Sequence, residues 1–209
     1  MTSLRPKSMV WVIATFAVAL LPQLPRMPAA LAALTLFPLA WRIGAELRGW
    51  KPLPALLRHV LTAAALLTLF FSYGNLTGRR AAVSLLAVML ALKLIECYRI
   101  RDARLVVSFS LFLAATQFLF GQGVGMPIYG FACTLMALVT LVRLQRDDAW
   151  ETLGAPPRVK ATLASELGFS LRLLALAIPA GLAFFLLFPR LATPLWGIPE
   201  STLDSRSGL

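Results

Sequence analysis

Residues 171–188 read LRLLALAIPAGLAFFLLF, and Arg172 is the only charged side chain in this run. A helix of about 20 apolar residues crosses the hydrocarbon core of a bilayer, and its backbone forms its hydrogen bonds within the segment because no water is present there. Six further apolar runs precede this one. The sequence therefore predicts an all-α fold, a polytopic transmembrane helix bundle of about seven spans. We expect the spans at residues 9–24, 28–41, 56–73, 81–98, 105–121, 127–144 and 171–188.

The second run, residues 28–41, is short for a crossing and contains Pro38. It either crosses the bilayer or forms, with the first run, a hairpin that dips and returns, and we expect a full crossing. Hydrophobic residues make up 59% of the chain, which leaves too little polar surface for a water-soluble domain. The net charge of +11 sits beside the apolar runs, so we expect it to meet anionic lipid rather than nucleic acid.

Lysine and arginine are concentrated on every second connection between the runs, and cytoplasmic connections carry such an excess. With the N-terminus in the cytoplasm, fourteen cations lie inside and five outside, while Lys93 is set apart as intramembrane. The inside set is Arg5, Lys7, Arg42, Arg48, Lys51, Arg58, Arg99, Arg101, Arg104, Arg143, Arg146, Arg158, Lys160 and Arg172. The outside set is Arg26, Arg79, Arg80, Arg190 and Arg206. We therefore expect a cytoplasmic N-terminus and an external C-terminus.

A charge cluster stands at the cytoplasmic end of the fourth run, at Lys93, Glu96, Arg99 and Asp102. Each residue is three positions from the next, so on one helix they share a face. An ionisable group within a span costs about 2.5 to 3.5 kcal/mol and usually faces protein or water. Lys93 lies roughly 9 Å below Arg99 along a helix, a depth from which its side chain reaches the interface. We expect structural ion pairing, with docking of a partner, transport or catalysis as the alternatives.

Residue types suited to thiol or metal chemistry are few. Cys97 lies near a cytoplasmic helix end and Cys133 inside the sixth run, and neither has a metal-ligand partner at a useful spacing. His59, the single histidine, follows Arg58 at an interfacial position. We therefore expect no catalytic residue, no metal and no cofactor in this chain.

Arginines also stand at the external ends of the runs. Arg79 and Arg80 precede the fourth run, and Arg190 follows the seventh. A guanidinium group binds phosphate through paired hydrogen bonds, so these three are candidate outer-face anion contacts. Anchoring at the lipid interface is the alternative.

Residues 159–167 have the apolar spacing of an amphipathic helix, with Lys160 and Glu166 on its polar side. We expect an interfacial helix with a solvated charged face. Docking of a cytoplasmic partner is the alternative.

After the seventh run, Pro189, Pro194 and Pro199 recur five residues apart, which excludes a regular helix and favours an extended chain. We expect residues 1–189 to form the transmembrane helix bundle. We expect residues 190–209 to be an extended segment that leads to an extracytoplasmic domain missing from this chain.

Three segments carry a resemblance to a known family: LKLIECYRIRDAR at 92–104, FLFGQG at 118–123, and LFPRLATPLWGIP at 187–199, which SRSGL follows at 205–209. They resemble the N-terminal membrane domain of TgpA-type transglutaminase-like proteins of bacteria, over essentially the whole chain. In that family such a bundle precedes a periplasmic domain that uses Cys, His and Asp in thiol catalysis. None of those catalytic residues can be matched in this chain.

The resemblance implies a membrane anchor and scaffold in the bacterial inner membrane, with its C-terminus in the periplasm. The chain alone is then inactive, and the full-length protein is transglutaminase-like or a related cysteine peptidase. The implied partners are the lipid bilayer, the missing C-terminal periplasmic domain and a cytoplasmic protein such as a MoxR-type AAA+ ATPase.

Two other functions remain open from the sequence. A small transporter would need polar side chains at mid-membrane on several spans, and these runs are mostly apolar. A membrane-embedded enzyme acting on lipid-linked substrates would use Arg79, Arg80 and Arg190 to hold phosphate.

Overall fold

The computed structural model describes residues 6–50, 53–74, 78–121, 123–153 and 162–187. Over these residues the chain is all-helical, as the sequence predicts. The α-helices are α1 (Pro6–Leu20), α2 (Ala29–Arg48), α3 (Ala55–Tyr73), α4 (Arg79–Ile95), α5 (Ile100–Ala115), α6 (Gly125–Leu153) and α7 (Leu163–Leu187). Two short 3-10 turns, Leu24–Arg26 and Thr116–Leu119, follow α1 and extend α5.

Membrane crossing is supported by the length and composition of the helices. Among the described residues, five segments are long and apolar enough to span a bilayer: Ala29–Arg48, Ala55–Tyr73, Ile100–Leu119, Gly125–Ala149 and Leu163–Leu187. Helix α1 is apolar but has 15 residues, and α4 has 17. The expected polytopic bundle of about seven spans is confirmed, and α1 and α4 are shorter than the five segments named above.

Helix α2 is longer than the sequence indicated. It continues through Pro38 to Arg48, a length of 20 residues, whereas the apolar run ends at residue 41. Twenty helical residues are about 30 Å long, enough for the hydrocarbon core, so the helix length favours the crossing over the hairpin. A proline inside a membrane helix is tolerated because neighbouring groups satisfy the freed carbonyl. Gly49, with a φ of 65°, then ends the helix in the left-handed region.

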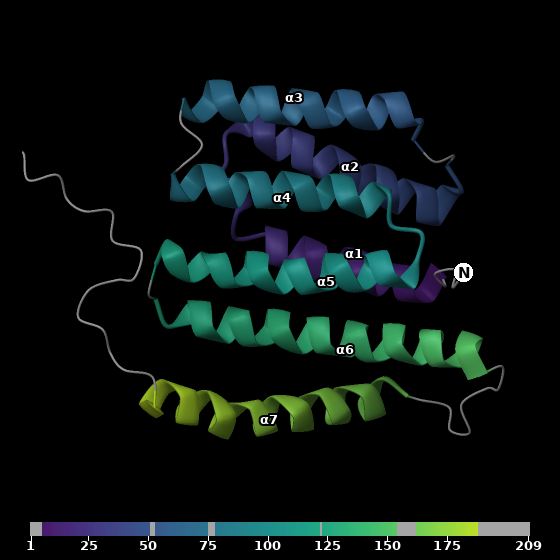
Figure 1. The fold of residues 1–209 in the computed structure, drawn as a ribbon, viewed down its shortest axis with the longest axis vertical. Helices are drawn as coiled ribbons and strands as arrows, with labels where there is room; N and C mark the ends of the chain where they lie inside the picture. The colour runs from purple at the N-terminus through teal and green to yellow at the C-terminus, as the bar shows by residue number, and fades with distance from the viewer. Residues whose placement is uncertain (1–5, 51–52, 75–77, 122, 154–161, 188–209) are drawn as a thin grey trace, which may run out of the picture. The chain divides into compact units, whose positions relative to one another are not determined.

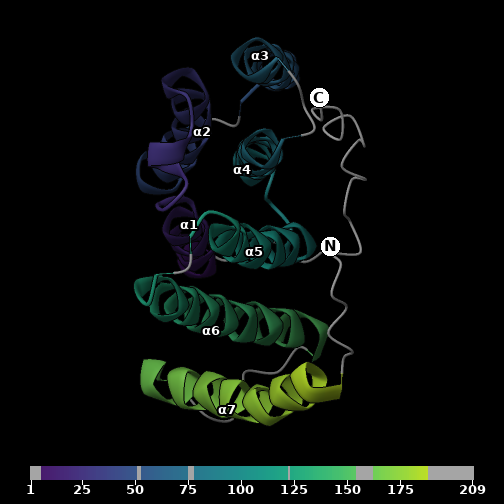
Figure 2. The same cartoon turned by 90° about the vertical axis from the view of Figure 1, so that its left-hand side faces the viewer.

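The chain divides into two compact units, residues 1–171 and 172–209. In the first unit, α1, α2, α4 and α5 form the centre, while α3 packs on α2 and α4, and α6 packs on α1 and α5. Figure 1 shows α3, α4, α5 and α6 side by side. Figure 2, turned by 90°, shows α2 beside α4 and α1 beside α5.

The apolar interior of the first unit has a larger and a smaller part. The larger part joins α1, α4, α5 and α6 through buried side chains such as Phe16, Leu94 and Leu113. The smaller part joins α2, α3 and α4 through Leu31, Leu69 and Val88. Most of the other large apolar side chains of α3 are exposed, as expected for a surface covered by lipid.

The second unit is described over residues 172–187, which complete α7. This stretch contains Pro179 and exposes large apolar side chains, among them Leu176, Phe184 and Leu187. The expected division at residues 189 and 190, the extended segment 190–209 and Arg190 lie outside the described residues.

The separate interfacial helix expected at residues 159–167 is wrong for its described part. Leu163 begins α7, which runs on without a break to Leu187. Glu166 is 4% exposed and not on a solvated face, because two arginines surround it. Residues 159–161 lie outside the described residues.

Candidate functional site

Charged side chains gather at both ends of the first unit, and the two ends differ. One end contains connections 49–54 and 96–99 and the contact between α6 and the start of α7; we call it the acid-paired end. The other contains connections 21–28, 74–78 and 120–124, which carry no aspartate or glutamate. We call that one the acid-free end, and it includes the first turn of α4.

The four residues of the predicted charge cluster lie at the acid-paired end, but not as a ladder. Helix α4 ends at Ile95 and α5 begins at Ile100, so the spacing argument, which needed one continuous helix, fails. Lys93 Nζ lies 3.4 Å from Asp102 Oδ1 across the turn between the helices. Glu96 Oε1 accepts a hydrogen bond from Arg58 Nη1 at 3.0 Å. Arg99 is exposed at the start of α5 and takes part in neither pair.

A buried arginine supports the turn between α4 and α5. Arg42 is 7% exposed, and its Nη2 donates to the carbonyl oxygen of Cys97 at 3.1 Å. Its guanidinium carbon lies 5.1 Å from the centre of the Tyr98 ring, a cation–π distance. Arg42 was read from the sequence only as one inside cation. Its burial depends on how α2 meets this turn, which the local sequence does not specify.

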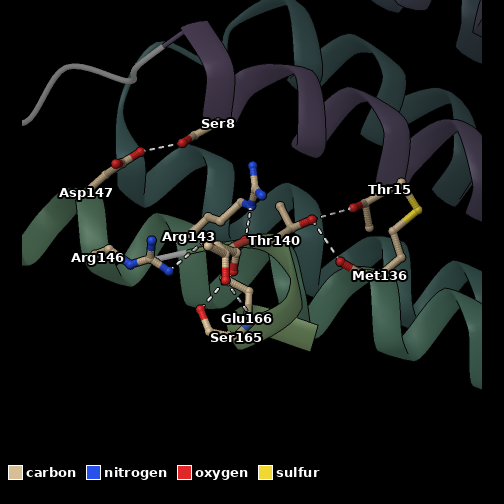
Figure 3. Close-up of polar contacts among 10 residues, drawn as sticks. Ser8, Thr15, Met136, Thr140, Arg143, Arg146, Asp147, Ser165 and Glu166 are labelled. Atoms are coloured by element: carbon tan, nitrogen blue, oxygen red, sulfur yellow. Dashed lines mark hydrogen bonds and ion pairs between the residues drawn. The ribbon is translucent and has the colours of Figure 1, made fainter. Parts of the chain in front are cut away.

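Helix α6 carries a second group of ion pairs at this end. Glu166 is held between Arg143 Nε at 2.5 Å and Arg146 Nη2 at 2.6 Å. Figure 3 shows both arginines beside Glu166, and the bond between Ser8 and Asp147 nearby. Arg104 Nη2 lies 2.6 Å from Asp148 Oδ2. These contacts tie α1, α5, α6 and the start of α7 together.

The cysteines show no sign of an activated thiol. Cys97 is fully buried, and that burial raises the pKa of its thiol from 9.0 to about 12, with the nearby Arg42 guanidinium opposing part of the rise. Cys133 is 4% exposed within α6. His59 is exposed near the start of α3. Among the described residues, no three His, Cys, Asp or Glu side chains are grouped so that they could hold a metal ion.

The acid-free end has a cleft of about 530 Å³, lined by Tyr73, Gly78, Arg79, Arg80, Ala81, Leu119 and Phe120. Two of the predicted outer-face arginines thus line one cleft. Arg79 Nη1 donates to the carbonyl oxygen of Leu119 at 3.0 Å. Arg80 also lines a smaller cavity beside the cleft, of about 10 Å³, which it shares with Arg26 and Phe120.

Arg26 joins this group, although the sequence indicated it only as an outside cation and not as an anion contact. Its guanidinium carbon lies 5.1 Å from the centre of the Phe120 ring. Its Nη1 is buried and has no hydrogen-bond partner among the described residues. The available signal was a lone arginine between Pro25 and Pro28 on a connection without acids. Its closeness to Arg80 follows only from how α2 packs on α4.

The comparisons with known proteins agree with one another. A family model described as "TgpA N-terminal domain" matches residues 11–209. The curated protein-glutamine gamma-glutamyltransferase of Pseudomonas aeruginosa is 30% identical over 210 residues, covering 100% of this chain. The chain spans 30% of the length of that relative. No solved structure matches the chain.

Proposed function

Because this chain belongs to the TgpA N-terminal domain family, we propose that it is the membrane anchor and scaffold of a TgpA-type transglutaminase-like protein. It holds a periplasmic, thiol-dependent catalytic domain at the bacterial inner membrane. The observation that carries this proposal is the match to the glutamyltransferase, which covers 100% of this chain but 30% of the relative. The matched part is this whole chain, whose described residues form the apolar helical bundle.

The chemistry of the described thiols supports placing the catalysis elsewhere in the full-length protein. Thiol catalysis needs a thiolate, a base within hydrogen-bond reach and donors for the oxyanion. Cys97 stays protonated at neutral pH, since burial raises the pKa of its thiol to about 12. The charged groups that act on it are Arg42, Asp102 and Lys93. None of these is a histidine base.

The charge distribution supports an orientation for the anchor. The acid-paired end contains Arg42, Arg58, Arg143 and Arg146, besides other cations of the predicted inside set. We place this end in the cytoplasm, because cytoplasmic connections carry the excess of lysine and arginine. An odd number of crossings then delivers the chain after α7 to the periplasm. A cytoplasmic partner such as a MoxR-type AAA+ ATPase would meet the exposed cations of this end.

The buried polar groups of the bundle do not favour a transporter. Thr15 and Thr140 hydrogen-bond each other at 2.9 Å, where α1 meets α6 (Figure 3). The hydroxyl of Tyr129 donates to the carbonyl oxygen of Val18. Side chains that satisfy one another tie helices together, whereas a substrate pathway needs polar groups that are open to water or to an ion.

The experiment separates the bundle from the domain that it is proposed to hold. A protease site is inserted after residue 189 of the full-length protein, and spheroplasts are treated with the protease. We expect the added protease to cut this site in intact spheroplasts, and the C-terminal fragment to keep its acyl-transfer activity on glutamine side chains. A site that stays protected until the membrane is broken contradicts the proposal. The same protein with a scrambled site is the control.

A further inference from the structure

We propose that the acid-free end binds the phosphate headgroup of an anionic phospholipid, with Arg80 and Arg26 as its main contacts and Arg79 beside them. This proposal does not depend on an attached catalytic domain. The first observation that supports it is the charge of the acid-free end. Connections 21–28, 74–78 and 120–124 carry no acid, so no carboxylate of these connections neutralises the three arginines. Guanidinium groups bind phosphate through paired hydrogen bonds.

The hydrogen bonds of the three arginines leave donors available. Arg79 uses Nη1 on the carbonyl oxygen of Leu119. Arg80 is exposed and forms no hydrogen bond or ion pair with the described residues. Arg26 keeps a buried Nη1 without a partner among them. A buried donor that is left unpaired is costly, and a phosphate oxygen at the small cavity shared with Arg80 would satisfy it.

The backbone adds donors at the same place. Helix α4 begins at Arg79, and its N-cap residue, Gly78, makes no side-chain capping bond. The first N–H groups of a helix have no partner within the helix, and the helix dipole places partial positive charge there. Gly78 and Ala81 line the cleft together with Arg79 and Arg80, whereas Arg26 lines the smaller cavity that Arg80 also lines. The two arginines of the cleft and the start of α4 therefore favour an anion at one position.

A lipid fits the cleft better than a free anion because of its surroundings. Tyr73, Leu119 and Phe120 form its apolar walls, and tyrosine is enriched where headgroups meet the hydrocarbon core. Phe71, two residues before Tyr73 in the chain, and Phe118, two residues before Phe120, are exposed, and exposed aromatic side chains of membrane helices contact acyl chains in a bilayer. A phosphate attached to acyl chains gains from both surfaces.

The experiment measures which lipid the protein retains. The full-length protein is transferred into mixed micelles of phosphatidylglycerol and phosphatidylcholine, and bound lipids are counted by native mass spectrometry. We expect selective retention of phosphatidylglycerol. Arg80→Gln should lower it about fivefold, as expected for about 1 kcal/mol per cation near an anionic headgroup, and Arg26→Gln should act similarly. Arg101→Gln, an exposed arginine of the other end, is the matched control and should retain the wild-type ratio.

Two further measurements keep the result decisive. Circular dichroism and gel filtration establish that each variant is folded, and Arg80→Lys, which keeps the charge, should restore most of the binding. If folded Arg80→Gln and Arg26→Gln retain phosphatidylglycerol as the control does, the proposal is overturned. A competition arm adds inorganic phosphate. Displacement of the lipid by equimolar inorganic phosphate would show an anion site without lipid preference, which also overturns it.

Discussion

At the acid-paired end, the buried carboxylate of Glu166 lies between two guanidinium groups, and Glu96 and Asp102 each meet a cation from another helix or turn. At the acid-free end, Arg79 meets a backbone carbonyl, Arg26 meets an aromatic ring, and Arg80 meets no described polar group. The same residue type therefore does two different things. Arginine at the first end stabilises contacts between helices, and arginine at the second end remains available to an anion.

The largest loss of stability is expected from a substitution of Glu166, at the acid-paired end. Glu166→Gln removes the charge that two arginines share. Opening a buried ion pair costs about 3 to 5 kcal/mol, and the partial exposure of both arginines lowers our expectation to about 2 to 3 kcal/mol. Denaturant unfolding in detergent micelles measures this loss. Glu46→Gln, a half-buried glutamate of α2, should change the unfolding free energy by less than about 0.5 kcal/mol. Equal losses for the two substitutions would refute the role of Glu166 as a buried ion-pair partner of Arg143 and Arg146.

The next prediction concerns how stability depends on pH through Cys97, which lies in the turn that Arg42 supports. The pKa of the Cys97 thiol is raised from 9.0 to about 12 in the folded protein, so the unfolded chain loses this proton first as pH rises. The stabilisation is complete below pH 9 and is lost between pH 9 and about 12. We expect wild type to lose about 1 kcal/mol more than Cys97→Ala between about pH 8 and about pH 10. Parallel stability curves for the two proteins would contradict a buried, protonated thiol.

A smaller effect is expected for the pair of Arg58 and Glu96, whose side chains are 31% and 42% exposed. A double-mutant cycle with Arg58→Gln and Glu96→Gln should give a coupling energy of about 0.5 to 1 kcal/mol. Added salt should reduce it, because solvent-exposed charges are screened. A coupling energy of zero at low salt would show that this contact does not stabilise the turn.

The smallest change in stability is expected from a substitution of Arg80, at the acid-free end. Arg80→Gln should change the unfolding free energy by less than about 0.5 kcal/mol in neutral detergent, since Arg80 makes no described polar contact. In micelles that contain phosphatidylglycerol, the variant should become less stable than wild type, because wild type alone gains the lipid contact. A large loss in neutral detergent would instead make Arg80 a structural residue like Arg143.

The sequence was sufficient for the helices and insufficient for their contacts. Apolar runs of bilayer length located the helices, because lipid imposes that length on any spanning segment. The observed helix ends differ from the predicted ones where a helix continues beyond its apolar run. Helix α2, for example, stays helical beyond its apolar run to Arg48. The chain also turned at Glu96, where the charge spacing by itself suggested a continuing helix.

The candidate sites show the same division. Arg79 and Arg80 are predicted from the sequence as anion contacts, and the structure places both in the lining of one cleft. Arg26 lines the smaller cavity that Arg80 also lines, and it comes from a connection more than 50 residues earlier in the chain, so no local pattern could include it. Glu166 was expected on a solvated face because its local spacing is amphipathic. Its burial is decided by Arg143 and Arg146 of another helix.

The orientation of the chain after α7 tests the central claim most directly. Alkaline phosphatase and green fluorescent protein are fused separately after residue 209, and each also after Gly49 in the connection between α2 and α3. The account predicts active phosphatase and no fluorescence after residue 209, with the reverse after Gly49. Fluorescence with inactive phosphatase after residue 209 would place this end in the cytoplasm and contradict the proposed anchor of a periplasmic domain.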